Sequence, residues 1–343
     1  MEVTVHNKAA IRGVASYIPD NRLTNEQLAN DFPEWSVDKI YEKTGIKSRP
    51  IADETETCSS MAINAAKKLF AKLSVTADSI DFILLCTQSP DYKLPTTACI
   101  IQNALGVPTS AGALDFNLGC SGYVYGLSIA KGLIESGQSK RVLLLTSELY
   151  SRYINKKDKS VRTLFGDAAT ATLVEGVKSE NELLGSFVFG TDGAGDRNLI
   201  VPHGGSVHPL NSDSFSEVCD KSGNFRSSAD LYMNGAEILS FTLKSVPLLV
   251  TNVLSKSAFD IENIDKVVFH QANKFMLDKL RKKLKFTEDQ FLVSYRDYGN
   301  TVSSSIPLGL ELAEQQNLLR KGENVLLCGF GVGYSWAGSI ITW

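Results

Sequence analysis

Cys120 has the local surroundings that a nucleophilic thiol needs. It lies in the segment Asn117–Gly122, which reads Asn-Leu-Gly-Cys-Ser-Gly, at a predicted turn from a strand into a helix. A thiol at a helix N-terminus faces unpaired backbone N–H groups and the positive end of the helix dipole, and both lower the thiol pKa. Gly119 and Gly122 allow backbone or substrate to approach closely. Cys120 is therefore a candidate nucleophile, although an inert buried thiol is an equally good interpretation.

Two polar residues later in the chain could act beside such a nucleophile. His270 follows the predicted strand Lys266–Phe269, and sites of α/β proteins are built at the C-terminal ends of parallel strands. Asn300 lies in the segment Tyr298–Thr301, directly before a predicted helix. Taken alone, a histidine at a strand end is more often structural, and an asparagine before a helix is a cap or a turn residue.

A glycine-rich turn, Gly329–Trp336, follows the last predicted strand. The dinucleotide-binding pattern G-x-G-x-x-G fails in both registers, because Tyr334 and Trp336 occupy the third glycine positions. Such a turn is better suited to direct a backbone N–H at a developing oxyanion. The sequence contains no Walker-type loop, zinc-binding helix or G-x-S-x-G elbow.

The elements that must position these residues alternate between strands and helices, which is typical of an α/β fold. Apolar runs rich in branched residues predict buried strands at 81–85, 141–145, 266–269 and 324–327. Helical spacing predicts helices at 120–137 and 305–322, with Gly137 and Gly322 as their C-terminal stops.

The chain also repeats itself once. Three segments recur in the same order, at an offset of 183 or 184 residues: 80–88 at 264–271, 126–130 at 309–313, and 142–145 at 325–328. Asn117 then corresponds to Asn300, so the helices that begin near Cys120 and near Asn300 become symmetry mates. We interpret the chain as two related halves, 1–178 with the cysteine and 179–343 with His270 and Asn300. The alternative is that any two βαβ units look alike.

Composition bounds the class of protein. The chain has 343 residues, of which 43% are apolar and 21% charged, as in ordinary globular proteins. Its 35 basic and 38 acidic residues give a net charge of −3, which provides no general footprint for nucleic acid. The longest uninterrupted apolar runs are far shorter than the ~18–20 residues of a membrane span. We therefore expect neither nucleic acid nor a membrane as a partner.

The N-terminus and the cysteines indicate a cytoplasmic protein. Residues 1–8 show no charged head followed by an apolar stretch, so no secretory signal is predicted. No two cysteines are spaced C-x-x-C and the four histidines lie far apart, so we expect no metal site. The cysteines other than Cys120 are interpreted as reduced packing residues: Cys58, Cys86, Cys99, Cys219 and Cys328.

From about Ile11 to Trp343 the chain resembles the β-ketoacyl-acyl carrier protein synthase III branch of the thiolase superfamily. The motifs that carry the resemblance are Lys43–Ile46, Asn117–Gly122, Phe165–Asp167, Thr191–Gly195 with Pro202–Gly205, His270–Asn273, Tyr298–Thr301 and the terminal glycine-rich turn. The resemblance implies a duplicated, five-layered α/β/α/β/α core with pseudo-twofold symmetry, which agrees with the repeat.

The resemblance also implies an acyltransferase of fatty acid biosynthesis with a catalytic Cys120, His270 and Asn300. Cys120 would take a primer acyl group from a thioester. His270 and Asn300 would stabilise the enolate formed when a malonyl thioester loses CO₂, and the carbanion would attack the acyl-cysteine to give a β-ketoacyl thioester. The oxyanion hole would use the backbone N–H groups of Cys120 and Val332. No metal or redox cofactor is implied.

Substrate contacts implied by the resemblance fall on Gly235, Ala272 and Asn273, and on three positions where this chain departs from the family. Lys39 replaces a tryptophan that stacks on the adenine of coenzyme A, and Lys159 replaces the arginine on its other face. Lysine does not stack as arginine does, so a carrier-protein donor or weaker coenzyme A binding is expected. Leu94 replaces an aromatic residue that the partner subunit of a homodimer contributes to the acyl pocket, which suggests a primer other than acetyl.

An acyl carrier protein is an acidic partner and needs a basic docking surface. The segment after His270 supplies Lys274, Lys282 and Lys283, together with other lysines and an arginine. A charged helix is equally well explained as a solvated face.

Other functions of the same superfamily remain as alternatives. A 3-hydroxy-3-methylglutaryl-CoA synthase needs a general-base glutamate where this chain places Gln88, and glutamine cannot take a proton. A head-to-head acyl condensation is a further possibility. Relatives that transfer acyl groups to alcohols or sugars often carry aspartate in place of Asn300. A non-catalytic partner subunit usually lacks the cysteine.

Overall fold

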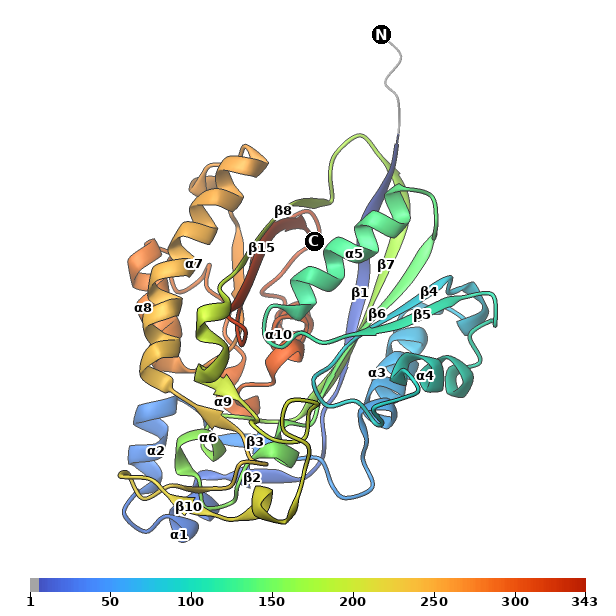
Figure 1. Cartoon of the computed structure of the whole chain (residues 1–343). Helices are drawn as coiled ribbons and strands as arrows, with labels where there is room; N and C mark the ends of the chain where they lie inside the picture. Colours follow the sequence, from blue (N-terminus) through green and yellow to red (C-terminus); the bar gives the residue numbers. More distant parts are fainter. Residues whose placement is uncertain (1–5) are drawn as a thin grey trace.

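The computed structural model describes residues 6–343 (Figure 1). Residues 1–5, which carry most of the segment used to predict the absence of a secretory signal, lie outside the described residues. Two β-sheets dominate the structure, and helices lie between them and on their outer faces.

The first sheet has five strands in the order β1-β7-β6-β4-β5. Strand β4 pairs in parallel with β5 and β6, whereas β7 pairs antiparallel with β6 and β1. The strands are β1 (His6–Tyr17), β4 (Phe82–Cys86), β5 (Gly112–Phe116), β6 (Arg141–Glu148) and β7 (Ala168–Ser179).

The second sheet has four strands in the order β13-β14-β15-β8 and repeats the pairing pattern of the first. Its strands are β8 (Leu184–Thr191), β13 (Lys266–Phe269), β14 (Asn324–Gly331) and β15 (Ser335–Thr342). Strand β14 begins and ends 183 residues after β6, so the repeated sequence segments occupy equivalent elements. A single parallel bridge from Val267 to Phe291 stands where the first sheet has β5.

Helices form three layers around these sheets. Helices α5 (Gly122–Glu135) and α10 (Ser305–Gln315) pack between the sheets, in one core cluster with apolar residues of both. The outer face of the first sheet is covered by α3 (Cys58–Leu73) and α4 (Thr97–Leu105). The outer face of the second is covered by α7 (Gly235–Ser257) and α8 (Lys274–Leu284). This arrangement confirms the predicted five-layered α/β/α/β/α fold.

Strands buried on both faces explain the continuous apolar runs of the sequence. Along β4 and β6, Leu84 and Leu144 face the central helices, whereas Ile83, Leu143 and Leu145 face the outer ones. Successive residues of a strand point to opposite faces, so each strand contributes to two cores.

Helix α10 is shorter than predicted. It ends at Gln315, and Asn317 adopts the left-handed conformation with φ 57°. The Leu318 N–H closes the helix on the Ala313 carbonyl at 2.8 Å. Gly322 instead lies in the turn that precedes β14.

Smaller elements fill one end of the molecule and the connections. The short helices are α1 (Asn25–Asp31), α2 (Val37–Thr44), α6 (Lys159–Arg162) and α9 (Tyr295–Tyr298). The 3₁₀ turns are η1 (Ala77–Ser79), η2 (Tyr150–Tyr153), η3 (Gly193–Asn198), η4 (Ser212–Phe215), η5 (Ile261–Asn263) and η6 (Val302–Ser304). The short strands are β2 (Arg22–Thr24), β3 (Ser48–Pro50), β9 (Leu199–Ile200), β10 (Val218–Cys219), β11 (Phe225–Arg226) and β12 (Tyr232–Met233).

Helix α7 is long and apolar enough to cross a membrane by length and composition alone. One such helix is weak evidence, because core helices of soluble proteins pass the same test. Its apolar residues Val246, Leu249 and Val253 are buried in the core cluster that covers the second sheet. This packing accounts for its composition.

Candidate active site

Cys120 lies in the turn between β5 and α5, two residues before the helix begins. Its side chain is buried against the glycine-rich segment of β14: a Cβ atom on Gly331 would lie 2.8 Å from the Cys120 Sγ atom. Burial, followed by the charge of Glu148, raises the pKa of Cys120 to about 12. The backbone N–H groups of Val332 and Cys120 oppose this rise. The lowered pKa predicted from the helix N-terminus is therefore wrong for the substrate-free chain, because desolvation outweighs the helix end.

His270 follows the C-terminal end of β13 and is held on three sides. Its Nδ1 atom lies 2.8 Å from the Ser305 Oγ atom, and its backbone N–H donates to the Cys328 carbonyl at 2.8 Å. The Phe330 ring stands edge-on to the imidazole, with centroids 5.6 Å apart. Burial lowers the pKa of His270 to about 3, so the imidazole is neutral at physiological pH.

Asn300 is fixed mainly through its backbone. Its N–H donates to the Leu164 carbonyl at 2.8 Å, and its carbonyl accepts from the Gly166 N–H at 3.0 Å. The side-chain Oδ1 atom accepts from the Val302 N–H at 2.9 Å. Because the oxygen is engaged in this turn, the amide Nδ2 is the atom left to donate to a ligand.

These three residues line one cavity of about 70 Å³, although they lie far apart in the sequence. Three other predicted substrate-binding residues, Gly235, Ala272 and Asn273, line it as well. The rest of the wall is mostly apolar and includes Leu164, Phe165, Leu199, Met233, Ile238 and Met276. A nucleophile and two potential hydrogen-bond donors thus share a cavity whose wall is mostly apolar.

Val332 follows Gly331 and lies beside Cys120, but it does not line this cavity. Its N–H faces the Cys120 thiol, and its Cγ1 atom would lie 2.6 Å from a Cβ atom on Gly119. Gln88 covers the same glycine, with its Oε1 atom also 2.6 Å from that position. The Gln88 amide accepts from the Tyr150 hydroxyl and donates to the Asn117 Oδ1 atom at 3.0 Å. The side chains of Val332 and Gln88 therefore fill the space around Gly119, the residue that precedes Cys120.

Three predicted substrate-binding residues lie outside the cavity. The Leu94 side chain is 82% exposed, and Lys39 is also exposed. The Lys159 ammonium forms an ion pair with Glu34 at 2.7 Å, and Lys39 donates to the Glu34 carbonyl at 3.1 Å. Both lysines therefore converge on Glu34.

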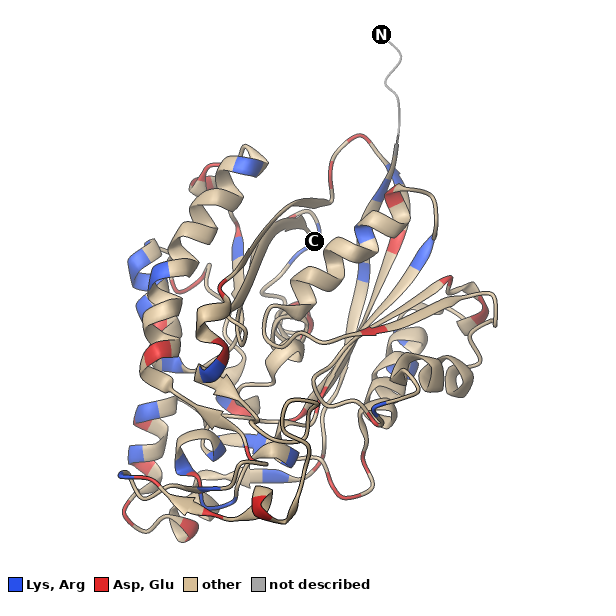
Figure 2. Cartoon of the chain, in the orientation of Figure 1, with Lys and Arg blue, Asp and Glu red and all other residues tan. Residues whose placement is uncertain are grey.

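The predicted docking lysines lie on α8, where basic residues recur along the helix (Figure 2). Lys274 pairs with Asp278 at 2.6 Å, and Lys283 donates to the Leu243 carbonyl at 2.8 Å. Lys282 is exposed to solvent.

Sequence reasoning missed Glu148, a fully buried carboxyl at the end of β6. Its Oε1 atom accepts from the Ser303 hydroxyl at 2.6 Å, and its Oε2 atom accepts from the Gln88 N–H at 3.1 Å. Burial raises the pKa of Glu148 to about 8. An acidic residue three positions after the apolar run of β6 was the available signal.

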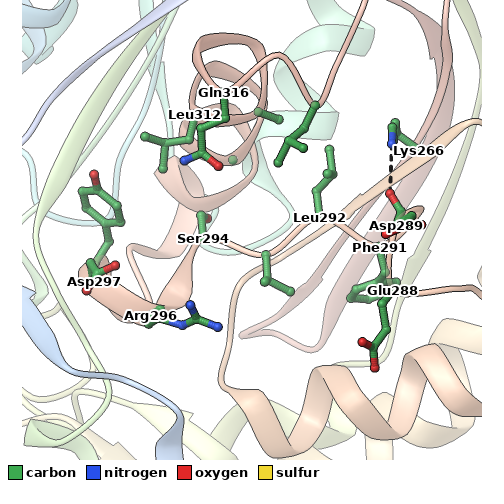
Figure 3. A pocket seen from close by; sticks show the side chains of 15 residues that line it. Lys266, Glu288, Asp289, Phe291, Leu292, Ser294, Arg296, Asp297, Leu312 and Gln316 are labelled. Atoms are coloured by element: carbon green, nitrogen blue, oxygen red, sulfur yellow. Dashed lines mark hydrogen bonds between the residues drawn. The ribbon is translucent and has the colours of Figure 1, made fainter.

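A second cavity, of about 630 Å³, lies away from the candidate catalytic residues (Figure 3). It lies between α10 and the segment 288–298, and Figure 3 shows Leu312 of α10 and Gln316, which directly follows the helix, on one side of it. Its lining includes charged residues and none of the candidate catalytic residues. Within residues 6–343, no group of three or more His, Cys, Asp and Glu side chains is arranged to hold a metal ion.

Comparison with known proteins gives one consistent result. The family model "3-Oxoacyl-[acyl-carrier-protein (ACP)] synthase III" matches residues 114–193, and its C-terminal counterpart matches residues 254–343. The chain is 36% identical to a β-ketoacyl-acyl carrier protein synthase III of Caldanaerobacter subterraneus, over 98% of each chain. It is 37% identical to one of Clostridium novyi, over 97% of this chain and 98% of that protein.

Solved structures agree with the sequence relatives. A 2.1 Å crystal structure of a 3-oxoacyl-acyl carrier protein synthase III superposes with a TM-score of 0.97 at 53% identity, covering 98% of this chain and 100% of that one. A 3-oxoacyl-acyl carrier protein synthase of Burkholderia xenovorans superposes with a TM-score of 0.89 at 38% identity, covering 98% and 94%. The duplicated thiolase fold and these relatives together show that the chain belongs to the 3-oxoacyl-acyl carrier protein synthase III family of condensing acyltransferases.

Proposed function

We propose that this enzyme loads a primer acyl group on Cys120 and condenses it with a malonyl thioester to give a β-ketoacyl thioester, as in the initiation of fatty acid synthesis. The observation that carries the proposal is the single cavity shared by Cys120, His270 and Asn300. A thiol nucleophile and two neutral hydrogen-bond donors are the groups that acyl transfer and enolate stabilisation require.

Acyl loading is the first half-reaction. The Cys120 sulfur attacks the thioester carbonyl carbon, and the donor thiol leaves when the tetrahedral intermediate collapses. The Cys120 and Val332 N–H groups, which already face the sulfur, hold the developing oxyanion. The high pKa of the Cys120 thiol means that it gives up its proton only in the reaction, and the departing donor sulfur takes up that proton to leave as a thiol.

Condensation is the second half-reaction. The malonyl thioester loses CO₂, and its thioester carbonyl becomes an enolate that accepts hydrogen bonds from the His270 ring and the Asn300 amide. A neutral imidazole suits this role, because it donates a hydrogen bond without holding the enolate as an ion pair. The carbanion attacks the acyl carbon on Cys120, and the cysteine thiolate leaves. Decarboxylation generates the carbanion and no electron is transferred, so the scheme uses neither a metal nor a redox cofactor.

An acyl carrier protein is the proposed partner of the condensation. The exposed basic face of α8 begins directly after Asn273, which lines the cavity, so an acidic carrier bound there would place its thioester near Cys120. Lys159, at the position of the family's adenine-stacking arginine, is engaged in an ion pair with Glu34, which favours a carrier-bound primer.

The proposal also includes a homodimer in the cytoplasm. Strand β5 is an edge strand that pairs only with β4 within the described chain, and an unpaired edge is a template for a second copy. Tyr92 and Leu94 are large apolar side chains exposed in the loop before α4. A partner copy would cover them.

Intact-protein mass spectrometry tests this function. The chain is incubated with a panel of acyl-CoAs and acyl-carrier proteins, and we expect a mass increase of one acyl group. The increase is absent in Cys120→Ala and present in Cys99→Ala, which removes an exposed thiol outside the cavity. Failure of every donor to label the wild type, or labelling of Cys120→Ala, would contradict the proposal.

A further inference from the structure

Three consecutive serines follow the turn at Asn300, and all three are buried. The first two attach this segment to the first sheet. Ser303 donates to the Glu148 carboxyl group at 2.6 Å. Ser304 shares a hydrogen bond with the Thr146 hydroxyl at 2.8 Å and donates to the Ala168 carbonyl at 3.0 Å. The segment belongs to the second half of the chain, so these bonds hold it by its side chains against β6 and β7.

The third serine is directed at the candidate site. The Ser305 Oγ atom lies 2.8 Å from His270 Nδ1 and accepts a hydrogen bond from the Gln271 N–H at 3.3 Å. Because the two preceding hydroxyls fix the segment, the position of Ser305 is set before any ligand binds.

A count of protons shows that the Ser305 hydroxyl can donate in its bond to His270. A serine hydroxyl has one proton and two lone pairs. The Gln271 N–H already occupies one lone pair of Ser305, so the hydroxyl proton is available to Nδ1. The imidazole is neutral, so it carries one proton, and an Nδ1 that accepts from Ser305 leaves that proton on Nε2.

The backbone three residues before Ser305 is strained, and this strain helps to position Asn300. Val302 has φ 53°, a left-handed conformation that a β-branched residue rarely adopts. In this conformation its N–H donates to the Asn300 Oδ1 atom, which orients the amide. Strain of this kind persists only where the surrounding contacts impose it, and the serine contacts follow immediately.

We propose that Ser305 is a positioning residue that holds His270 in the Nε2–H tautomer, so that His270 donates a hydrogen bond to the carbonyl of the extender thioester. The inference rests on the proposed function, because it assigns the second half-reaction to His270. Ser305 acts through His270 and is not required for the attack of Cys120 on the primer. Loss of its hydroxyl should therefore separate the two half-reactions.

The two half-reactions are measured separately in Ser305→Ala. Loading of Cys120 by acyl donors should stay within about twofold of the wild type, whereas release of CO₂ from malonyl-CoA and malonyl-carrier protein should fall roughly 10–100-fold, as for other partners that orient a histidine. Ser305→Thr, which keeps the hydroxyl, should restore decarboxylation. The matched control is Ser339→Ala, which removes a buried hydroxyl whose partners, the carbonyls of Gly185 and Ile340, lie on the second sheet outside the cavity.

The tautomer itself is read by long-range ¹H–¹⁵N NMR of the ¹⁵N-histidine-labelled full chain, with His270 assigned by His270→Ala. Four histidines make the spectrum tractable. We expect an unprotonated Nδ1 and a protonated Nε2 in the wild type. A protonated Nδ1, unchanged decarboxylation in Ser305→Ala, or equal loss of both half-reactions would overturn the inference. If the wild type does not load Cys120, the proposed function fails, while the NMR signal still decides the tautomer.

Discussion

The Glu148 carboxyl group accepts a hydrogen bond from the Ser303 hydroxyl at 2.6 Å, and this bond joins the two halves of the chain beside the candidate site. Glu148 ends β6 of the first sheet, and Ser303 follows Asn300 in the second half. The other carboxyl oxygen holds the Gln88 backbone. One buried side chain thus links the turn that carries Asn300 to the loop that covers Gly119.

The stability of the protein should depend on the protonation of Glu148. Burial raises its folded-state pKa from 4.5 to about 8, so its favourable contribution is complete below about pH 4.5 and is lost as the pH rises through 8. Relative to Glu148→Gln, the wild type should lose free energy of unfolding over this range, on the order of a few kcal/mol.

Urea unfolding at pH 5 to 9 measures this difference. Asp167, whose pKa is raised to about 6 by burial, is present in both proteins, and its negative charge above that pH adds to the rise in the Glu148 pKa. A difference between the two proteins that stays constant with pH would contradict the prediction.

Gly331→Ala should impair acyl loading while the chain still folds. The added Cβ would lie 2.8 Å from the Cys120 Sγ atom and 2.9 Å from its Cβ atom, so the nucleophile must move. A displacement of this size costs roughly 10–100-fold in rate. The rate of acyl loading on Cys120 is measured by quenching the reaction at successive times and determining the acylated fraction by mass spectrometry. Gly132→Ala is the control, because nothing lies within 4 Å of its Cβ position in α5, and it should load normally and be slightly stabilised.

Val332→Gly should broaden the range of primers that Cys120 accepts. The substitution keeps the backbone N–H but removes the side chain whose Cγ1 atom lies against Gly119. The profile of acyl groups attached to Cys120, from short to long and branched donors, is compared between variant and wild type. An unchanged profile would mean that Val332 does not limit the space available to the acyl group.

Charge reversal on α8 should weaken the use of carrier-bound substrate. In Lys282→Glu, and more strongly when Lys274 and Lys283 are also reversed, we expect KM for malonyl-carrier protein to rise several-fold, and the effect to shrink at high salt. The activity with malonyl-CoA should be unchanged. Lys67→Glu on α3, which covers the opposite outer face of the molecule, is the control. Equal loss with both substrates would argue against docking at α8.

Much of the fold could be predicted because its signals are local and repeated. Branched apolar runs predicted β4, β6, β13 and β14, and the common offset predicted that the last of these repeats β6. The end of α10 could not be predicted in the same way, because Asn317 closes the helix five residues before the glycine expected to do so. Helix ends depend on which residue adopts the left-handed conformation, and several candidates stood in that segment.

The sequence by itself determined the chemical inventory of this protein: a cysteine before a helix, a histidine after a strand, and an asparagine at the symmetry-related helix. Only the tertiary structure decided their state. Burial raises the pKa of Cys120 and lowers that of His270, because both lose water to residues that are distant in the chain. The tertiary structure also forms the hydrogen bond between Ser303 and Glu148 and the ion pair between Lys159 and Glu34. Desolvation and pairing depend on what surrounds a group in space, and the local sequence does not contain that information.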